Sequence, residues 1–598
     1  MRRWTAPIAL GLSLTLAVPA QAGVIAPGGQ DSTTSADLRV DVDRDGRLTA
    51  RDEPGENGWS QGRGAIFLPN LDDDERRCKL QPGDLTAPGT AVDERLVACH
   101  DAADERVNGP RDVADLAPVE IRPLRGIGPA ATGRLTITPA DKARVHPGGE
   151  LTAGQLRGGL RLGLEGRDII RDPAKWDGRI TVRLTVTDPA LPGGSSVDEV
   201  VLKVAPLMLQ NDLQDATKVF AGKPSDGPGW PGTPPYGEDV PGEWEPFAKS
   251  LNRAVPTTFV PGHPMWWKDM WWQDSFEPAT ASMPAPGGIQ TMRIMIRSAN
   301  LWDFPVNGQL VPTLRPLGRL LFRDLRGPDV GVVQEYTPQS RPGMDDLLNM
   351  GGNIESLPPY DGYPHGRLVY GAGARKPDAR FVRMLTGQGL QPPVVIDTSW
   401  LVVGHADETT HVVRANNARG WTLAVADPRL AVRMLTKAQR EGAGGQRLFT
   451  ETRVKDKPAI NEVLARDRAV NEEAAARIDE QLAILLAATG LRRDELVPLP
   501  VLFERHQDTG LLRAYTPGLV NGLSISAREF AAPVPHGPKV KGIDIFRRAT
   551  EKALGRQGIR VHWVEAFFWA HLGGGEVHCA TNAWRDTRST NRWWTAAR

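Results

Sequence analysis

Glycine and proline recur along the whole chain, which carries 63 glycines and 50 prolines among its 598 residues. Proline lacks an amide proton and glycine loses the most conformational entropy on ordering, so both interrupt long helices and strands. The sequence therefore predicts many turns, few long helices and a β-rich or mixed α+β fold. The clearest helix is predicted over residues 458–489, where apolar side chains fall on one face and Gly490 follows as a stop signal.

The first 22 residues have the pattern of an export signal. Arg2 and Arg3 precede an apolar run over 6–18, and a small-x-small cleavage site ends at Ala22. We expect cleavage near Ala22 and a secreted or periplasmic mature protein. The apolar run is too short to span a bilayer, so we expect no stable membrane insertion.

Charge and length limit the partners and the domain count. Lys plus Arg and Asp plus Glu number 72 each, so no net field attracts nucleic acid, and we expect no such partner. The length predicts roughly two to four domains. Apolar and polar residues alternate in short runs over 37–205, as at Ile180, Val182 and Leu184, which is typical of a β-sandwich. After residue 206, strand-like apolar runs alternate with helix-like segments.

The three cysteines divide into two kinds. Cys78 and Cys99 are close in sequence and are natural partners in an oxidising compartment, although the sequence leaves open whether they are bonded. Cys579 is then left alone, either as a liability or as a reactive thiol. Its neighbours must decide between these alternatives.

The segment MWWKDMWWQDSFE over 265–277 places Trp271 and Trp272 directly before Gln273 and Asp274. Its tryptophans fit an ordinary apolar core, and composition alone favours that interpretation. They also fit a cation site made of an aromatic face and a carboxylate, because charged side chains beside indoles are unusual in a core.

The segment LVVGHADETTHVV over 401–413 contains His405 and Asp407. If the apolar run before them is a strand that continues, the two side chains project to the same side. A histidine beside a carboxylate suits acid–base chemistry and cation binding. A metal pair is the alternative, although we find no third and fourth ligand at the usual spacing.

Two glycine-rich stretches complete the set. GGNIESLPPYDGYPHGRLVYG over 351–371, taken alone, indicates a structural turn that holds a carboxylate. GGGEVHCATN over 573–582 sets Cys579 beside a histidine, and its glycines would let backbone approach a ligand closely. An imidazolium or a cationic substrate would favour the thiolate. We therefore expect Cys579 to act as a nucleophile with His405.

Taken in order, WWQD, GGNIE…PP…YPHGRLVYG, GHADE and GGGEVHCATN resemble the protein-arginine deiminase family. Upstream, DVDRDG over 41–46 and GAIFLPNLDDD over 64–74 resemble the calcium-binding part of the family's immunoglobulin-like domain. The resemblance covers nearly the whole mature chain. It implies an immunoglobulin-like β-sandwich over 23–205 and a catalytic five-bladed α/β propeller, the pentein fold, over 206–598.

The resemblance also implies a role for each motif residue. Cys579 would be the nucleophile, His405 the general acid and base, and Asp274 and Asp407 the carboxylates that grip the guanidinium. Thiolate attack and loss of ammonia would give a covalent thiouronium, which water hydrolyses to citrulline. Two further residues would bind substrate: Trp271 through the aliphatic stem of the arginine, and Arg297 through the substrate backbone.

Calcium is the cofactor that the resemblance implies. One group of oxygen ligands would lie in the N-terminal loops: Asp41, Asp43, Asp45, Asp72 and Asp74. A second group would lie near the active site: Gln273, Glu277 and Glu355. Ser275 stands where calcium-activated members carry an acidic residue, so calcium is expected either to activate the enzyme or only to stabilise it.

The sequence thus predicts an exported enzyme that converts peptidyl arginine in proteins or peptides to citrulline. One alternative is a deiminase of free arginine or a small guanidine. Another is a non-catalytic, calcium-dependent binding protein of the cell surface. The protein substrates, the calcium stoichiometry and the oligomeric state do not follow from the sequence.

Overall fold

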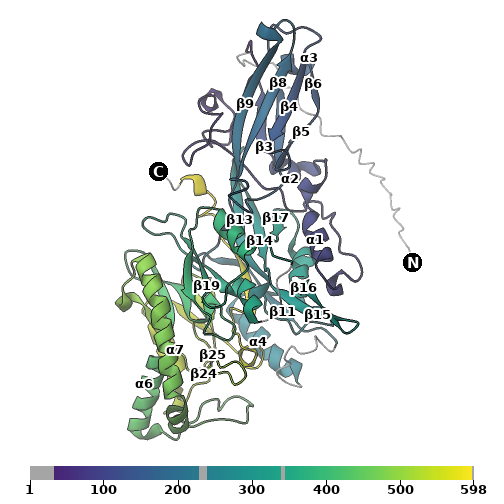
Figure 1. The fold of residues 1–598 in the computed structure, drawn as a ribbon. Helices are drawn as coiled ribbons and strands as arrows, with labels where there is room; N and C mark the ends of the chain where they lie inside the picture. Colours follow the sequence, from purple (N-terminus) through teal and green to yellow (C-terminus); the bar gives the residue numbers. More distant parts are fainter. Residues whose placement is uncertain (1–32, 228–238, 339–343, 596–598) are drawn as a thin grey trace, which may run out of the picture.

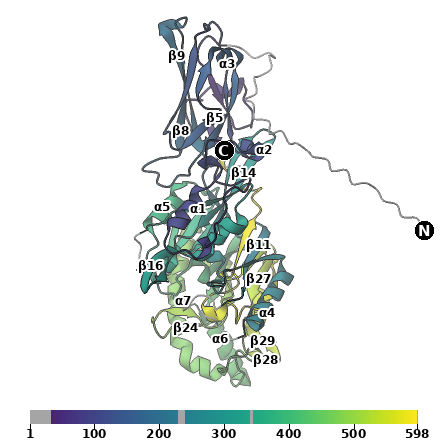
Figure 2. The same cartoon turned by 90° about the vertical axis from the view of Figure 1, so that its right-hand side faces the viewer.

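The computed structural model describes residues 33–227, 239–338 and 344–595. The expected export signal over 1–22 lies outside these residues. The described chain is elongated, with a β-rich N-terminal part at one end and a larger, helix-bearing part at the other (Figures 1 and 2). The fold is mixed α+β, as the glycine and proline content predicts.

Two sheets that share one apolar core form the N-terminal part. One has the order β1-β3-β7-β5 (Leu38–Val40, Ala117–Ile121, Leu160–Gly166 and Ala143–His146). The other has the order β2-β9-β8-β4-β6 (Ala65–Phe67, Ser195–Val204, Arg179–Thr187, Thr132–Thr138 and Glu150–Thr152). Along β8, Ile180, Val182 and Leu184 are buried and the residues between them are not, so the predicted alternation is confirmed.

In the sequence, three short helices occur between these strands: α1 (Ala91–Ala98), α2 (Gly109–Ala114) and α3 (Ala153–Gly158). A disulfide joins Cys78, in the loop after β2, to Cys99, which follows α1; their Cα atoms are 5.8 Å apart. The pairing that the sequence left open is therefore present. Cys579 is free and buried, so its thiol is available for chemistry.

Five small sheets in the described chain after residue 207 repeat one pattern of pairing. In each, one strand pairs antiparallel with one neighbour and parallel with another. The five are β10-β13-β14-β17 (Met208–Leu209, Phe276–Ala285, Gly288–Arg297, Val330–Val333); β18-β19-β20 (Ile354–Leu357, Arg367–Ala372, Val394–Asp397); β21-β22-β23 (Thr410–Arg414, Trp421–Asp427, Val497–Pro500); β26-β27-β30 (Leu523–Ser526, Glu529–Pro533, Arg560–Val564); and β12-β11-β31 (Thr257–Pro261, Ala216–Lys223, Thr581–Arg585). The last sheet joins strands from the two ends of this part.

Helices lie in the crossovers of four of these parallel pairs, and the crossover from β14 to β17 holds the β15-β16 ribbon (Leu301–Val306, Gln309–Leu314) instead. The helices are α4 (Val240–Ala254), α5 (Ala379–Gly387), α6 (Pro428–Ala438), α7 (Ile460–Thr489) and α8 (Ile545–Gly555). α7 is the predicted long helix, and it ends at Gly490, whose φ of 69° suits a glycine cap. Its apolar face is buried through Ala474, Ile478 and Leu482.

Three two-stranded ribbons complete the fold: β15-β16 (Leu301–Val306, Gln309–Leu314), β24-β25 (Phe503–Arg505, Leu512–Ala514) and β28-β29 (Lys539–Val540, Ile543–Asp544). Within the described ranges, no helix combines the length and the apolar character that crossing a membrane requires.

Candidate active site

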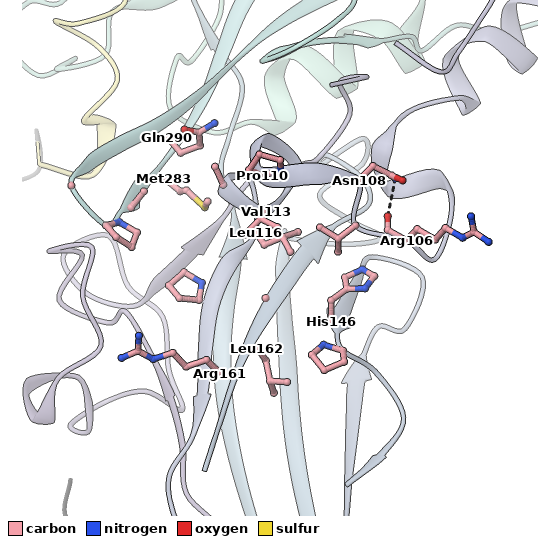
Figure 3. Close-up of a pocket in the computed structure, with 18 of the residues that line it drawn as sticks. Arg106, Asn108, Pro110, Val113, Leu116, His146, Arg161, Leu162, Met283 and Gln290 are labelled. Atoms are coloured by element: carbon pink, nitrogen blue, oxygen red, sulfur yellow. Dashed lines mark hydrogen bonds between the residues drawn. The ribbon is translucent and has the colours of Figure 1, made fainter. Parts of the chain in front are cut away.

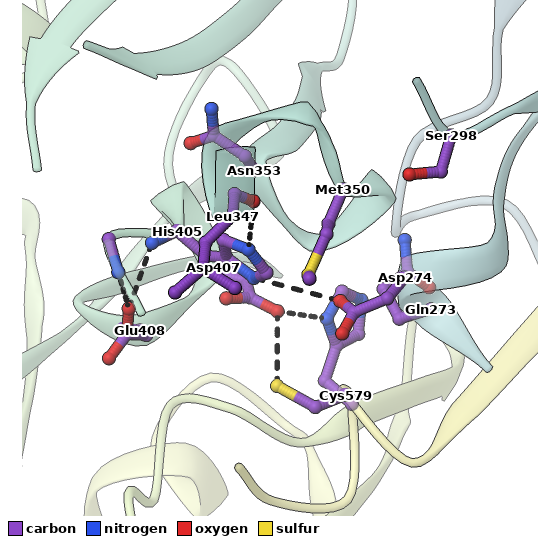
Figure 4. Close-up of polar contacts among 12 residues, drawn as sticks. Gln273, Asp274, Ser298, Leu347, Met350, Asn353, His405, Asp407, Glu408 and Cys579 are labelled. Carbon is purple, nitrogen blue, oxygen red and sulfur yellow. Dashed lines mark hydrogen bonds and ion pairs between the residues drawn. The ribbon is translucent and has the colours of Figure 1, made fainter. Parts of the chain in front are cut away.

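The four residues expected to be catalytic converge in one buried place (Figure 4). The sulfur of Cys579 lies 3.7 Å from Oδ2 of Asp407, and Nδ1 of His405 lies 3.7 Å from Oδ1 of Asp274. His405 and Asp407 are 0% exposed, and Asp274 and Cys579 are each 6% exposed. Three segments far apart in the sequence thus build a single site.

Short 3-10 turns, rather than strands, carry the acidic residues and the histidine. Asp274 lies in the turn Gln273–Ser275, directly before β13, and Asp407 lies in the turn Ala406–Glu408. The expectation that His405 continues a strand is therefore wrong. Glu408 forms this turn instead, since its Oε1 accepts the amide protons of both Gly404 and His405 at 2.8 Å.

Gly352 marks the point where these side chains meet. A Cβ atom added there would lie 2.6 Å from Nδ1 of His405, 3.1 Å from Oδ2 of Asp407 and 3.2 Å from Oδ1 of Asp274. Only the absence of a side chain lets the three groups approach one another across the Gly351–Asn353 turn. The stretch that alone indicated a structural turn is thus part of the site.

Backbone contacts fix the cysteine. Its amide proton goes to Oδ1 of Asn521 at 3.3 Å, and its carbonyl accepts the amide of Gln273 at 3.2 Å. A Cβ on Gly575 would lie 2.4 Å from the ring of Trp271 and 3.0 Å from Cβ of Cys579. Trp271, which is half-buried, therefore lies beside Cys579. The neighbouring Trp272 is buried, so the apolar-core interpretation holds for that residue.

Asp274 and Asp407 each have one carboxylate oxygen held by a protein cation and one left free. Oδ2 of Asp274 pairs with Arg315 at 3.1 Å, and Oδ2 of Asp407 accepts a hydrogen bond from Nδ1 of His578 at 2.9 Å. Oδ1 of both carboxylates and Nδ1 of His405 are buried without a hydrogen-bond partner. Leaving such atoms unpaired costs free energy, so the arrangement suits a cationic ligand with several N–H donors.

The electrostatic environment favours the protonated thiol of Cys579 when no substrate is bound. Burial, and then the charges of Asp407 and Asp274, raise the pKa of the Cys579 thiol well above its usual range. Burial opposes protonation of His578, but the hydrogen bond to Asp407 and the charge of Glu355 raise its pKa to about 9. A thiol therefore faces two carboxylates until a cation neutralises them.

Three expected calcium ligands lie together beneath the catalytic residues. Gln273, Glu277 and Glu355 line one small cavity. Nε2 of Gln273 donates to Oε2 of Glu277 at 3.0 Å, while Oε1 of Glu355 is buried and unpaired. Burial raises the pKa of both glutamates well above the ordinary value. Nε2 of His578 lies 4.0 Å from Oε1 of Glu355, and the carboxylate and amide oxygens of this group fit a divalent metal with oxygen ligands.

The remaining expected ligands form two acidic clusters in the N-terminal part. In one, Asp41, Asp43 and Asp45 bring carboxylate oxygens within 4.8 Å of one another. In the other, Asp72 and Asp74 are joined by Asp115, which the sequence did not single out. Burial and neighbouring carboxylates raise the pKa of each of these last three, so this cluster also fits a cation.

Arg297 does not lie where substrate could reach it. Its side chain is 1% exposed and pairs with Asp93 at 2.7 Å and with Gln334 at 2.6 Å. The expected contact with the substrate backbone therefore needs correction: a buried guanidinium is satisfied by an internal carboxylate. Its other nitrogen donates to the carbonyl of Arg315 at 3.2 Å.

A larger cavity, about 1140 Å³, lies between the N-terminal sheets and the β13-β14 turn (Figure 3). Arg106, His146 and Arg161 line it from one side, and Met283 and Gln290 line it from the other. The catalytic side chains do not line this cavity, so its size alone does not make it the reaction site.

Comparison with known proteins places these residues in context. A mouse (Mus musculus) protein-arginine deiminase type-4 is 25% identical over 93% of this chain and 82% of its own length. A mouse protein-arginine deiminase type-1 is 30% identical over 47% of this chain, which spans only 43% of that relative. The solved amidinotransferase SxtG from Microseira wollei shares 11% identity over 63% of this chain and 97% of its own, and its TM-score of 0.29 does not establish a shared fold.

The chain also matches a sequence family. The family described as protein-arginine deiminase (PAD) matches residues 195–595, which make up most of the chain and include the four positions expected to be catalytic. The segments that converge at the thiol all fall inside this range. The chain belongs to the protein-arginine deiminase family.

Proposed function

We propose that this protein hydrolyses the guanidinium group of arginine in proteins or peptides, giving citrulline and ammonia. One observation carries the proposal: the free oxygens of Asp274 and Asp407 and the free nitrogen of His405 are buried, unpaired and grouped beside a free cysteine. A guanidinium offers planar, paired N–H donors that two carboxylates can share. The family membership supports the same chemistry.

The arrangement supports a two-stage reaction through Cys579. The bound guanidinium neutralises the carboxylates and lowers the thiol pKa, so that the thiol proton passes to His405. The sulfur then attacks the central carbon, and His405 returns the proton to the departing ammonia, leaving a thiouronium. Water, deprotonated by His405, attacks the same carbon and the C–S bond breaks. The thiolate takes the proton back from His405, and the proton of the new C–OH group passes to ammonia, so citrulline and ammonium leave.

The test is an assay of citrulline and ammonia with an N-blocked arginine ester and with free arginine. Faster turnover of the ester supports the peptidyl substrate, whereas faster turnover of free arginine supports the small-guanidine deiminase. A folded protein that binds the ester but releases no product would be a binding protein. Cys579→Ala is the control, since it should bind without turnover.

We propose a five-bladed pentein propeller over 206–598. The shared pairing pattern of the five sheets and the contact between β11 and β31 support five repeated units closed by the two ends of the domain. We propose the immunoglobulin-like fold for 23–205, supported by its two sheets around one core.

We propose calcium as the cofactor. Glu277, Glu355 and Gln273 would hold one ion near the active site, and the two acidic clusters of the N-terminal part would hold others. Bound calcium would add positive charge beside these carboxylates. The catalytic steps themselves use Cys579, His405 and the two aspartates.

We propose that the protein acts outside the cytoplasm, on arginine-containing proteins or peptides. The signal-like first 22 residues support export. The disulfide between Cys78 and Cys99 also fits an oxidising compartment.

A further inference from the structure

We propose that Arg315 is a positioning residue for the deimination: it fixes one oxygen of Asp274 and thereby presents the other oxygen to the substrate guanidinium. The inference rests on the proposed function, because it assigns a second task inside the same site. No sequence pattern singled out Arg315, since it follows the β15-β16 ribbon and belongs to none of the motifs described above.

A forked ion pair holds the Arg315 guanidinium. One terminal nitrogen lies 3.1 Å from Oδ2 of Asp274, while Nε and the other terminal nitrogen reach Asp269 at 2.9 and 2.5 Å. The same nitrogen that meets Asp274 is 3.2 Å from the sulfur of Met350. The planar fork thus ties a non-catalytic aspartate to a catalytic one.

The ion pair between Arg315 and Asp269 is almost fully shielded from bulk water, which would weaken it. The Arg315 side chain is 4% exposed and the Asp269 side chain is 1% exposed, and the guanidinium lies 5.1 Å from the ring centre of Trp302. Its backbone is also fixed, because its carbonyl accepts from Arg297 at 3.2 Å. A carboxylate attached to such a support cannot turn freely.

This support also determines the position of the second carboxylate oxygen of Asp274. Oδ1 of Asp274 is buried without a hydrogen bond and points toward His405, 3.7 Å away. Asp407 repeats the arrangement, with His578 holding Oδ2 and Oδ1 unpaired. Each carboxylate therefore offers one oriented oxygen, and the substrate guanidinium is held between two single acceptors rather than by a bidentate grip at Asp274.

The molecule contains a matched control. Arg319 is equally buried and makes the same kind of fork, to Asp93 at 2.9 and 2.7 Å, but Asp93 is not a catalytic residue. A buried pair that only stabilises the fold should behave alike at both positions. Arg315→Gln releases the Asp274 carboxylate, whereas after Arg319→Gln the Asp93 carboxylate keeps its ion pair with Arg297 at 2.7 Å.

The experiment measures binding and turnover separately. In a Cys579→Ala background, calorimetry with an N-blocked arginine ester should show affinity weakened ~10- to 100-fold by Arg315→Gln and unchanged by Arg319→Gln. With Cys579 present, KM should rise more than kcat falls for Arg315→Gln, while Arg319→Gln lowers only the melting temperature. Arg315→Lys keeps the charge but loses the fork, so its affinity should be intermediate.

Two outcomes would overturn the inference: unchanged binding by Arg315→Gln, which means a structural pair, and tighter binding, which means that Arg315 competes with substrate. Should Arg315→Gln not fold, wild-type affinity and KM in Arg315→Lys would overturn it equally. The binding arm needs no turnover. A wild-type protein that makes no citrulline therefore refutes the proposed function alone.

Discussion

The sulfur of Cys579 lies 3.7 Å from Oδ2 of Asp407, and no protein cation contacts that sulfur among the described residues. Burial and the two catalytic aspartates raise the pKa of this thiol well above its usual range. The empty enzyme is thus expected to hold a protonated thiol at neutral pH, and the cationic substrate itself creates the nucleophile.

Alkylation of Cys579 checks this expectation directly. The rate with iodoacetamide should be low near pH 7 and should still be rising above pH 9, because the thiolate fraction grows with pH up to the raised pKa. The other two cysteines are joined in a disulfide, so the signal reports one residue. A rate that levels off below about pH 8.5, the ordinary thiol value, would contradict the resting state described here.

Gly352→Ala should damage catalysis without unfolding the protein. The new Cβ would lie 2.6 Å from Nδ1 of His405, so the imidazole and the aspartates must move apart, and a misplacement of about 1 Å costs on the order of 10²-fold in rate. kcat/KM measured beside the melting temperature tests this. Gly445→Ala is the control, since a Cβ there meets nothing within 4 Å; equal activity in both variants would refute the prediction.

The sequence patterns predicted those helices and strands whose formation depends mainly on neighbouring residues. α7 was predicted because its apolar period and Gly490 act within the helix itself, and β8 because its alternation reports one buried face. No sequence repeat marks the five-fold pairing, so only the family resemblance suggested it. The contact of β11 with β31 joins residues more than 350 positions apart, and only tertiary packing determines it.

The residues of the candidate site also fall into two groups, those that sequence motifs identify and those that only the fold brings in. Cys579, His405 and the two aspartates lie in motifs that can be read from residue type and spacing. Arg315 and Asn521 act through contacts from distant segments, so no local signal identifies them. Arg297 shows the converse error, because a motif position predicted substrate contact, whereas the fold buries this guanidinium against Asp93.

Removing the disulfide should lower stability and leave chemistry intact. Cys78 and Cys99 are 21 residues apart, and a crosslink of this span typically contributes about 3 kcal/mol by restricting the unfolded chain. The double variant Cys78→Ser/Cys99→Ser should lose that free energy of unfolding in urea, with kcat/KM unchanged. Reduced wild type should match it. A large loss of activity in folded protein would place the crosslink in the catalytic machinery.

Calcium binding should release protons at neutral pH. The pKa of Glu277 is raised mainly by burial, so its carboxyl holds a proton until a cation displaces it, and calcium affinity should rise with pH. Calorimetry in two buffers of different ionisation enthalpy measures the released protons. Glu277→Gln/Glu355→Gln should abolish part of the release, whereas Cys579→Ala should keep it. Identical heats in both buffers would exclude this site.

His578 should stabilise the metal-free protein only below a defined pH. Burial opposes its charge, but Asp407 and Glu355 raise its pKa to about 9, against about 6.5 in an unfolded chain. Because the folded pKa is the higher one, the stabilisation is complete below about pH 6.5 and disappears as the pH rises through about 9.

The shift corresponds to about 3 kcal/mol at most. Urea unfolding of wild type and His578→Asn, both with chelator, should therefore differ most at pH 6 and least at pH 10. Asn can still donate one hydrogen bond to Asp407 but carries no charge, so the pH-dependent part of the difference isolates the imidazolium. A difference that stays constant from pH 6 to 10 would mean that His578 is neutral in the folded protein, and Asp407 would then lack the cation that holds its Oδ2.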